Sequence, residues 1–245
     1  MSEQVIKKVL ITGANGFIGG TLMRYYQNNN QDVVGVDLVG NGSDVIEGDI
    51  AQPDTISHLL QECDVIIHTA ALVSNAMQDS DMWRVNVLAT RNLIEAAKAY
   101  KVRRFVQISS IVAYGNSAEG ELDESHPVHA DGGSYVLTKL ASEHVVLGAQ
   151  ANNEIEVVIL RPGDAYGPGS RPWIIAPLEA IAKNQFMLPA KGEGFFRPIY
   201  IDDLVRGIAM AASNPDAAGE IFNLSCEGYM LSLIHISEPT RREGI

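Results

Sequence analysis

The sequence has little of what marks several classes of protein. Its 245 residues include only two cysteines, Cys63 and Cys226, and no C-x-x-C pair. This argues against a disulfide framework, and we expect two reduced, structural thiols in a cytoplasmic protein. No apolar run approaches the roughly 18 residues of a membrane helix. The opening residues, MSEQVIKKVLITG, lack the pattern of a signal peptide.

Positive charge is also scarce. Lys and Arg together number 18 against 30 Asp and Glu, which gives a net charge of −12. An acidic surface argues against nucleic acid or an anionic membrane as a main partner. His126 and His129 lie in a loop without a Cys, His or acidic cluster, so no metal site is expected. Neither a G-x-S-x-G elbow nor a Walker motif occurs.

What the sequence does contain is a regular alternation of two kinds of segment. Val- and Ile-rich runs alternate with amphipathic segments. The apolar runs lie at 7–13, 32–38, 43–50, 64–71, 103–110, 156–162 and 220–225. The amphipathic segments lie at about 16–29, 53–62, 82–100, 134–151, 173–183 and 202–213. Continuous apolar runs are typical of parallel strands buried on both faces. We therefore predict an α/β fold, a Rossmann-type doubly wound parallel sheet of about seven strands with helices on both faces.

Two stretches interrupt this alternation. The segment 163–200 is rich in Gly and Pro, and we expect it to be a small, irregular substrate-binding insertion in a domain formed by 1–162 and 201–230. The last residues, 231–245, resemble the translated read-through of a synthetic sequencing adapter. We expect a non-native tail on a truncated chain, the alternative being a natural, frayed C-terminus.

The first chemical motif is LITGANGFIGG. Its glycines, Gly13, Gly16 and Gly19, follow the first predicted strand and open the first predicted helix. A bound pyrophosphate needs this arrangement, because the chain must turn sharply, the backbone must come close and the helix N-terminus must face the anion. The motif favours a dinucleotide site over an ordinary glycine-rich turn, with Asn15, Phe17 and Ile18 as further contacts.

The strand ends that follow supply the rest of this predicted site. Asp37 ends the second strand, where a carboxylate can bind both ribose hydroxyls and would repel a 2′-phosphate. No arginine follows at 38–43, so NAD is favoured over NADP. The motifs GDI and HTAALV place Asp49, Ile50, Ala70 and Ala71 beside the cofactor, while His68 is expected to be packed rather than catalytic.

A second motif joins Tyr135 and Lys139 in SYVLTK. Residues four apart share one face of a helix, but such a pair on its own is more often a surface pair. The wider context is a series of motifs in order: TGANGFIGG, GDI, HTAA, NVLATRNLIEAA, SSIVAYG, YVLTK, RPGDAYGPG and RPIYIDDL. From about residue 7 to residue 228 the chain resembles the extended short-chain dehydrogenase/reductase superfamily, in its NAD-dependent epimerase/dehydratase and 3β-hydroxysteroid dehydrogenase-like group.

The resemblance implies a catalytic set of Ser110, Tyr135 and Lys139. Tyr135 would be the general acid/base, with its phenol pKa of about 10 lowered by the charge of Lys139. Lys139 would also bind the nicotinamide ribose, and Ser110 would bind and position the substrate oxygen. The resemblance further implies cofactor contacts from Asn86, Arg161 and Pro162, and a homodimer through the helices at 82–100 and 134–151.

On the substrate side the resemblance points to Ser110, Tyr166 and Arg197. Nucleotide-sugar enzymes often carry Arg-x-Phe-Asn where this sequence has Gly163-Asp164, and Arg-Asp where it has Arg197-Pro198. We therefore expect an NAD-dependent oxidoreductase that acts on a hydroxyl or keto carbon of a small, sterol-like or other carbonyl substrate. The alternatives are a nucleotide-sugar epimerase or dehydratase with tightly bound NAD, and a cofactor-binding regulator without turnover.

Overall fold

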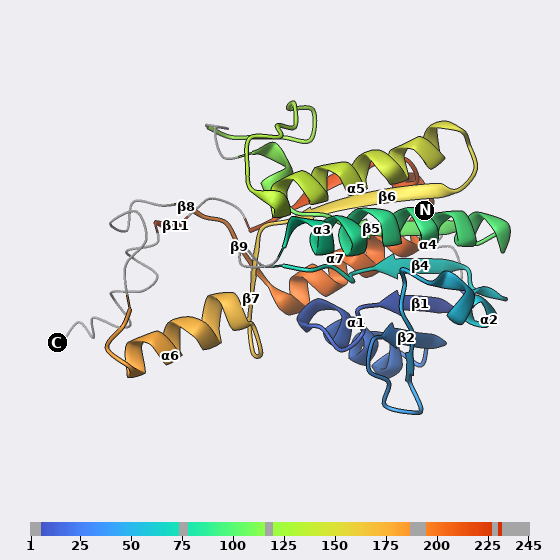
Figure 1. Ribbon diagram of the computed structural model, residues 1–245, viewed down its shortest axis with the longest axis horizontal. Coiled ribbons are helices and arrows are strands. Elements are labelled where there is room, and N and C mark those ends of the chain that lie inside the picture. The colour runs from blue at the N-terminus through green and yellow to red at the C-terminus, as the bar shows by residue number, and fades with distance from the viewer. Residues whose placement is uncertain (1–5, 74–77, 116–119, 187–194, 227–229, 232–245) are drawn as a thin grey trace.

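A seven-stranded parallel sheet forms the centre of the computed structural model, which describes residues 6–73, 78–115, 120–186, 195–226 and 230–231. The strand order is β10-β6-β5-β4-β1-β2-β3. The strands are β1 (Val9–Thr12), β2 (Val33–Asp37), β3 (Val45–Glu47), β4 (Val65–His68), β5 (Arg104–Ile108), β6 (Glu156–Pro162) and β10 (Ile221–Leu224). The predicted Rossmann-type sheet is confirmed (Figure 1).

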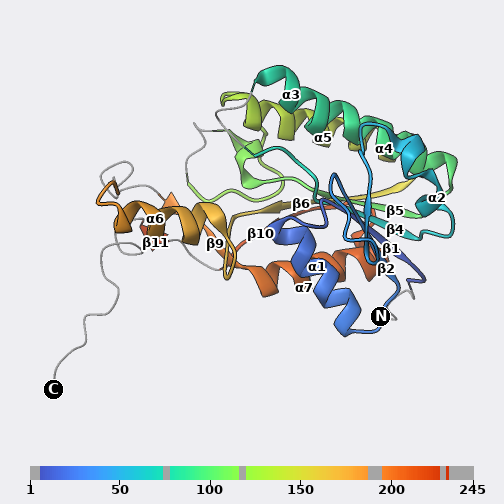
Figure 2. The same cartoon turned by 60° about the horizontal axis from the view of Figure 1, so that its bottom comes forward.

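Helices cover both faces of the sheet because its strands are buried on both sides. Every residue of β1, β4 and β5 is buried, as the continuous apolar runs predict. Helices α1 (Phe17–Asn28) and α7 (Ile201–Ser213) pack on one face, and α4 (Ala89–Ala99) and α5 (Ser134–Ala151) on the other (Figure 2). The order of the strands reverses between β1 and β4, and such a switch point is where ligands bind in open α/β sheets.

Two predicted helices differ from the observed ones. The segment 53–62 forms only a 3₁₀ turn, Pro53–Thr55, and the single-turn α2, Ser57–Leu60. The helix expected at 82–100 begins earlier, because α3 (Asp79–Trp83) continues through a π-helical turn, Arg84–Leu88, into α4. A π turn holds one extra residue and is frequent at functional sites.

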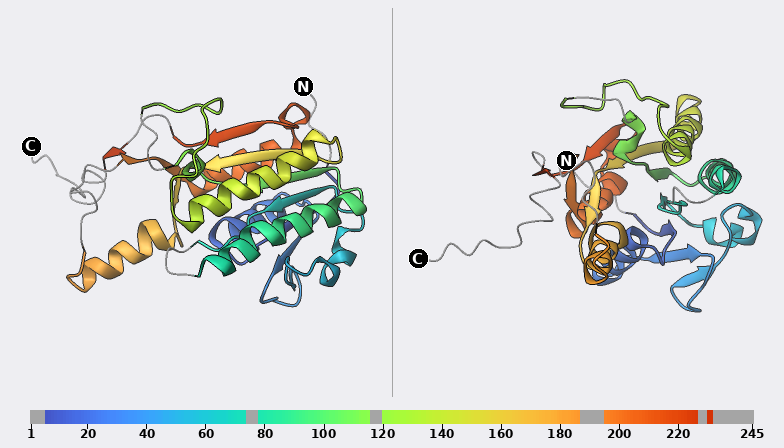
Figure 3. Two further views of the ribbon diagram at one scale, coloured as in Figure 1. Left: turned by 45° about the horizontal axis from the view of Figure 1, so that its top comes forward. Right: turned by 60° about the vertical axis from the view of Figure 1, so that its left-hand side comes forward.

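The segment 163–200 has more regular structure than the expected irregular insertion. Strand β7 (Asp164–Tyr166) pairs in parallel with β9 (Pro198–Tyr200), and a π turn at Arg171–Ile175 leads into α6 (Ala176–Ala182). Strands β8 (Phe195–Phe196) and β11 (Met230–Leu231) form a second small pair. Figure 3 shows α6 beyond the carboxyl ends of the main strands. Of the predicted tail 231–245, all but Leu231 lies outside the described residues.

The two cysteines differ in their surroundings, although both are free thiols. Cys63 is buried in the core, and burial raises the pKa of its thiol to about 12. This agrees with the expected structural thiol. Cys226 is exposed, so the expectation of a structural role is wrong for that residue.

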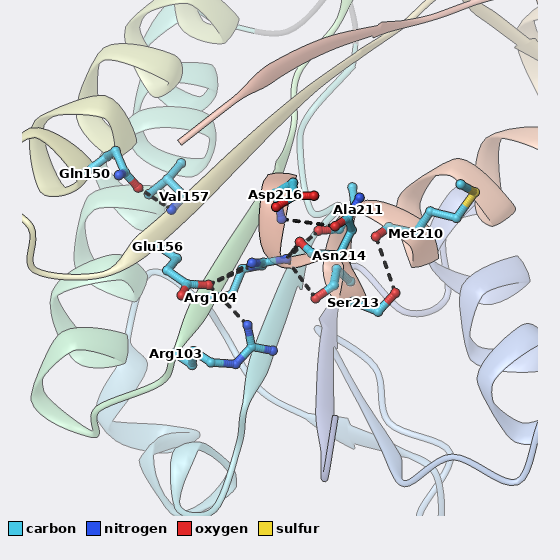
Figure 4. Close-up of polar contacts among 11 residues, drawn as sticks. Arg103, Arg104, Gln150, Glu156, Val157, Met210, Ala211, Ser213, Asn214 and Asp216 are labelled. Carbon is cyan, nitrogen blue, oxygen red and sulfur yellow. Dashed lines mark hydrogen bonds and ion pairs between the residues drawn. The ribbon is translucent and has the colours of Figure 1, made fainter. Parts of the chain in front are cut away.

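At the amino ends of β5 and β6 a buried arginine connects the sheet to α7 (Figure 4). Arg104 is 0% exposed and forms an ion pair of 2.9 Å with Glu156, its partner in the strand register. Its Nη1 donates to the carbonyl oxygens of Ala211, Ala212 and Asn214 at 2.9, 3.2 and 2.6 Å. The guanidinium therefore satisfies carbonyl groups that every helix leaves without partners at its C-terminus.

Replacing Arg104 with methionine should destabilise the protein by about 3–5 kcal/mol, because buried carbonyl groups and one partner of an ion pair lose their contacts. Denaturant unfolding followed by circular dichroism measures this. Arg206→Ala is the matched control, since Arg206 pairs with Asp203 on the exposed side of α7 and should cost less than about 1 kcal/mol. Equal losses in the two variants would contradict a capping role for Arg104.

Candidate functional site

The glycine-rich turn between β1 and α1 is tightly packed and leaves no room for a side chain at two of its glycines. Gly13 has φ +70°, in the region that favours glycine. A Cβ on Gly13 would lie 2.8 Å from the Cα of Ala70, and one on Gly19 would lie 2.1 Å from the Gly13 carbonyl oxygen. Neither side chain could be accommodated without moving the turn. The turn therefore brings the N-terminus of α1 and the end of β4 together at the switch point, as the motif predicts.

The N-terminus of α1 has no side-chain cap. Gly16 precedes the helix and supplies no side chain to cap it, and the first turn holds no acidic residue. Phe17 and Ile18, in that turn, are half-buried. The first N–H groups of a helix lack intrahelical partners and carry the positive end of its dipole. These observations fit the pyrophosphate of a dinucleotide.

Asp37 lies at the carboxyl end of β2, beside the glycine turn. Its carboxylate accepts hydrogen bonds from the backbone N–H groups of Asn15 and Leu38, at 2.9 and 2.8 Å. The Asn15 side chain donates to the carbonyl of Val39 at 2.6 Å. The carboxylate is thereby held at the strand end, where it is placed to accept ribose hydroxyl groups.

The other predicted cofactor residues line the neighbouring strand ends. Asp49 accepts a hydrogen bond from the backbone N–H of Ala51 at 2.9 Å, so its carboxylate already stabilises a turn. Ile50 is buried in the core, while Ala70 and Ala71 are half-buried after β4. The predicted contacts of these residues with a cofactor stay predictions.

His68, at the end of β4, is packed inside the protein. Its ring nitrogens lie 2.7 Å from the hydroxyl of Thr12 and 2.9 Å from that of Thr90. Burial, and then the charge of Lys139, lower the pKa of His68 to about 3. A neutral imidazole held by two hydroxyl groups agrees with a packed rather than a catalytic histidine.

Asn86 supports the loop after β4 instead of presenting its amide to a ligand. Its side chain accepts from the N–H of Leu72 at 2.7 Å and donates to the Leu72 carbonyl at 3.0 Å. It also donates to the hydroxyl of Thr138 on α5 at 3.1 Å. The π turn places this buried amide between the loop and α5, which a regular helical spacing could not have revealed.

Ser110, Tyr135 and Lys139 come together at the carboxyl ends of β5 and β6. Ser110 follows β5, and its side chain lies close to that of Tyr135 in the first turn of α5. Lys139 is 5% exposed, and its Nζ donates to the Ile108 carbonyl at 2.9 Å. That Nζ lies 5.9 Å from the centre of the Tyr135 ring. The surface-pair alternative for Tyr135 and Lys139 is thus excluded.

The protonation equilibria of this pair differ from the expectation. Burial raises the pKa of Tyr135 to about 12, while the nearby side chain of Ser110 lowers it by less. Burial also lowers the pKa of Lys139 to about 8, against an opposing effect from Glu143. The expected fall of the tyrosine pKa is wrong for this structure, because desolvation outweighs the opposing effect of Ser110.

Arg161 has its guanidinium in a buried ion pair. Nη2 lies 2.7 Å from Glu143, and Nη1 donates to the hydroxyl of Tyr114 at 3.0 Å. Glu143 also accepts from Ser109 at 2.5 Å. The guanidinium of Arg161 is thus engaged within the protein, and the predicted cofactor contacts of Arg161 and Pro162 stay predictions. The sequence interpretation missed Glu143, although its position four residues after Lys139 places it on the same face of α5.

Besides Ser110, the predicted substrate residues are Tyr166, which ends β7, and Arg197, which directly precedes β9. Tyr166 is paired in register with Tyr200, and the two ring centres are 5.5 Å apart. Asp164 accepts a hydrogen bond from the backbone N–H of Arg197 at 2.9 Å. Burial raises the pKa of Asp164, and the hydrogen bond from Arg197 opposes this. Arg197 is half-buried beside it.

The parallel sheet, the glycine turn at its switch point and the Ser–Tyr–Lys arrangement together define a dinucleotide-dependent enzyme of the short-chain dehydrogenase/reductase type. The model of the NAD dependent epimerase/dehydratase family matches residues 9–225, and the chain belongs to this family. It is an NAD-dependent oxidoreductase of the extended short-chain dehydrogenase type.

Individual relatives in this family differ in what they act on. The low-salt glycan biosynthesis protein Agl12 of Haloferax volcanii is 28% identical over 94% of this chain and 80% of its own length. The sterol-4-alpha-carboxylate 3-dehydrogenase ERG26, decarboxylating, of Candida albicans is 31% identical over 75% of this chain and 57% of its own. The UDP-glucuronic acid 4-epimerase of Bacillus cereus, solved with UDP-glucuronic acid and NAD, superposes with a TM-score of 0.83 at 29% identity, covering 92% of this chain and 80% of that one.

Neither a metal site nor a membrane-spanning helix is found in the described part of the chain. Its residues contain no group of three or more His, Cys, Asp or Glu side chains arranged to hold a metal ion. No helix within the described ranges has the length and apolar character needed to cross a bilayer.

Replacing Gly19 with alanine should weaken NAD binding by on the order of 100-fold, because the added Cβ would displace the Gly13 carbonyl and open the turn. Isothermal titration calorimetry with NAD⁺ measures the change. Gly148→Ala is the matched control, since a Cβ there meets no atom within 4 Å on the exposed side of α5. A similar loss in both variants would contradict a specific role for the turn.

Proposed function

We propose that Ser110, Tyr135 and Lys139 handle the proton in a hydride transfer at a carbinol or carbonyl carbon. The observation that supports this most directly is their convergence at the strand ends, where Ser110 lies close to Tyr135 and the Lys139 ammonium lies 5.9 Å from the centre of the Tyr135 ring. When bound, NAD supplies the hydride acceptor for such a reaction. The glycine turn, Asp37 and the backbone after β4 would hold it.

Tyr135 is the group that exchanges a proton with the substrate oxygen in this proposal. With its pKa raised to about 12 the phenol is protonated at neutral pH and can donate to the oxygen of a ketone as that oxygen gains charge. In the direction of alcohol oxidation Tyr135 must first lose its proton. The ammonium of Lys139 then stabilises the phenolate, and Ser110 keeps the substrate oxygen within reach.

The substrate that we propose is a small, largely apolar carbonyl or hydroxyl compound, sterol-like in character. An aromatic cluster formed by Tyr166, Trp173, Phe196 and Tyr200 stands beyond the strand ends, with Trp173 and Phe196 ring centres 4.8 Å apart. Trp173 and Tyr200 remain partly exposed. Aromatic surfaces of this kind favour apolar ligands, and the match to the sterol dehydrogenase of Candida albicans supports the same class.

A nucleotide sugar is the second candidate substrate, with the chain acting as an epimerase or dehydratase on tightly bound NAD. The similarity to the UDP-glucuronic acid 4-epimerase supports it. Against it stands Asp164, in the place where such enzymes often have an amide. Its carboxylate already accepts a hydrogen bond from the backbone N–H of Arg197, and a carboxylate on the substrate side would disfavour an anionic diphosphate.

A coupled screen of alcohols, ketones and sugar nucleotides should distinguish the two. We expect net formation of NADH with an apolar alcohol, recorded as absorbance at 340 nm, while a sugar nucleotide is recovered unchanged. Replacing Tyr135 with phenylalanine removes the proton-exchanging group and should lower turnover by about 10²–10⁴-fold. Calorimetry on the same variant should show little change in NAD⁺ affinity.

Two outcomes would contradict the proposal. If a sugar nucleotide isomerises or loses water with no net change in NAD, the second candidate is correct. If Tyr135→Phe turns over at the rate of the unmodified enzyme, the catalytic assignment is wrong whichever substrate is used.

We also propose that the protein is a cytoplasmic homodimer, paired through the helical run 79–99 and α5. Trp83 and Leu88 are exposed on this run, 41% and 51%, and burial of such side chains favours association. Light scattering should give twice the mass of one chain, and Leu88→Glu should shift the mass to that of the monomer. A monomeric unmodified protein would contradict the interface.

A further inference from the structure

The carboxylate of Glu143 lies at the centre of a buried polar cluster directly below the proposed catalytic residues. Its side chain is 2% exposed, and that of Arg161 is 3% exposed. Glu143 accepts two hydrogen bonds from Arg161, at 3.0 and 2.7 Å, and one from Ser109, at 2.5 Å. Both carboxylate oxygens are therefore in use, as burial of a charge requires.

Arg161 is fixed on its other side by the end of the sheet. Its Nη1 donates to the Tyr114 hydroxyl at 3.0 Å, and that hydroxyl donates to the side chain of Asn223 on β10 at 2.9 Å. The guanidinium carbon lies 4.8 Å from the centre of the Tyr114 ring. Three strand ends, those of β5, β6 and β10, are thus tied to one residue of α5.

A buried ion pair of this kind contributes little net free energy to the packing of a helix on a sheet. Desolvation of the two charges offsets much of their attraction, and apolar side chains of similar size would often be as stabilising. A purely structural purpose therefore accounts poorly for the pair. Its position points to a different purpose, because Glu143 is one turn beyond Lys139 on the same face of α5 and next to Ser109, the neighbour of Ser110.

We propose that Glu143 is a positioning residue: its buried carboxylate holds Ser109 and the strand end against α5 and places a negative charge one helical turn from Lys139. The other groups that face Lys139 from the neighbouring elements do not supply negative charge. On α5 it faces Tyr135, on β4 His68, which is neutral, and on β5 the Ile108 carbonyl. From β6 the nearest charged side chain, Arg161, is directed at Glu143.

The electrostatic balance at Lys139 supports this role. Burial lowers the pKa of its ammonium, and the charge of Glu143 opposes this effect. A lysine that must stabilise a phenolate has to stay protonated while the phenol loses its proton. Without the carboxylate, desolvation would release the Lys139 proton at lower pH. The inference thus rests on the proposed catalytic role of Lys139, but not on the identity of the substrate.

Titration of lysine Cε by ¹³C NMR, with the Lys139 signal assigned through Lys139→Arg, tests the proposal without any substrate. Glu143→Gln keeps the size and removes the charge, and should move the midpoint of Lys139 to lower pH by on the order of 1 unit. Glu143→Asp keeps the charge and should therefore leave the Lys139 midpoint close to that of the unmodified protein. Calorimetry with NAD⁺ at pH 7 and pH 9 should show affinity falling more steeply with pH in Glu143→Gln than in the unmodified protein.

Glu156→Gln is the matched control, because Glu156 also pairs with a buried arginine, Arg104, but at the opposite end of β5 and β6 (Figure 4). It should cost stability and leave the Lys139 midpoint unchanged. Should Glu143→Gln fail to melt cooperatively, Glu143→Gln/Arg161→Gln removes both buried charges and should still lower the midpoint.

A folded Glu143 variant whose Lys139 titrates like that of the unmodified protein would overturn the proposal, and so would an equal shift in Glu156→Gln. These results are independent of the substrate screen. If the screen fails but Glu143→Gln lowers the Lys139 midpoint as expected, the proposed substrate is rejected and the role of Glu143 is not affected.

Discussion

Burial of the parallel sheet on both faces is the constraint on which the rest of this structure depends. Because α1 and α7 cover one face and α4 and α5 the other, polar chemistry is confined to the ends of the strands. The carboxyl ends carry the glycine turn, Asp37, Ser110 and the start of α5. The amino ends of β5 and β6 carry Arg104 and its ion pair with Glu156. The same two strands thus carry an Arg–Glu pair at each end: one with a partly exposed glutamate at the amino ends, and one fully buried beneath the proposed catalytic residues.

Much of this arrangement could be predicted from the sequence, because it depends on local pattern. Apolar runs predicted the seven strands, and glycines at fixed spacing predicted the turn between β1 and α1. In the structure this turn leaves no space for a Cβ at Gly13 or Gly19. The helical spacing of Tyr135 and Lys139 also placed them on one face. Ser110 follows β5 and is distant from both in the sequence. To predict that it meets them required the resemblance to a known superfamily as well as the spacing.

What could not be predicted depends on contacts between distant parts of the chain. The helix expected at 53–62 is reduced to short turns, and the pairing of β7 with β9 joins residues on either side of α6. Asn86 owes its orientation to a π turn that sequence spacing does not indicate. The pKa of Tyr135 moved in the direction opposite to the expected one, because the depth of burial cannot be read from a sequence.

The contacts of Arg104 also have a consequence for the order in which the chain can fold. Its guanidinium binds carbonyl groups that follow it by 107 to 110 positions. Closing so long a loop is slow compared with forming a helix. Until α7 has been synthesised and has docked, the amino end of β5 holds a charge without its full set of partners. We therefore expect the amino end of β5 to reach its final form only after α7 has docked.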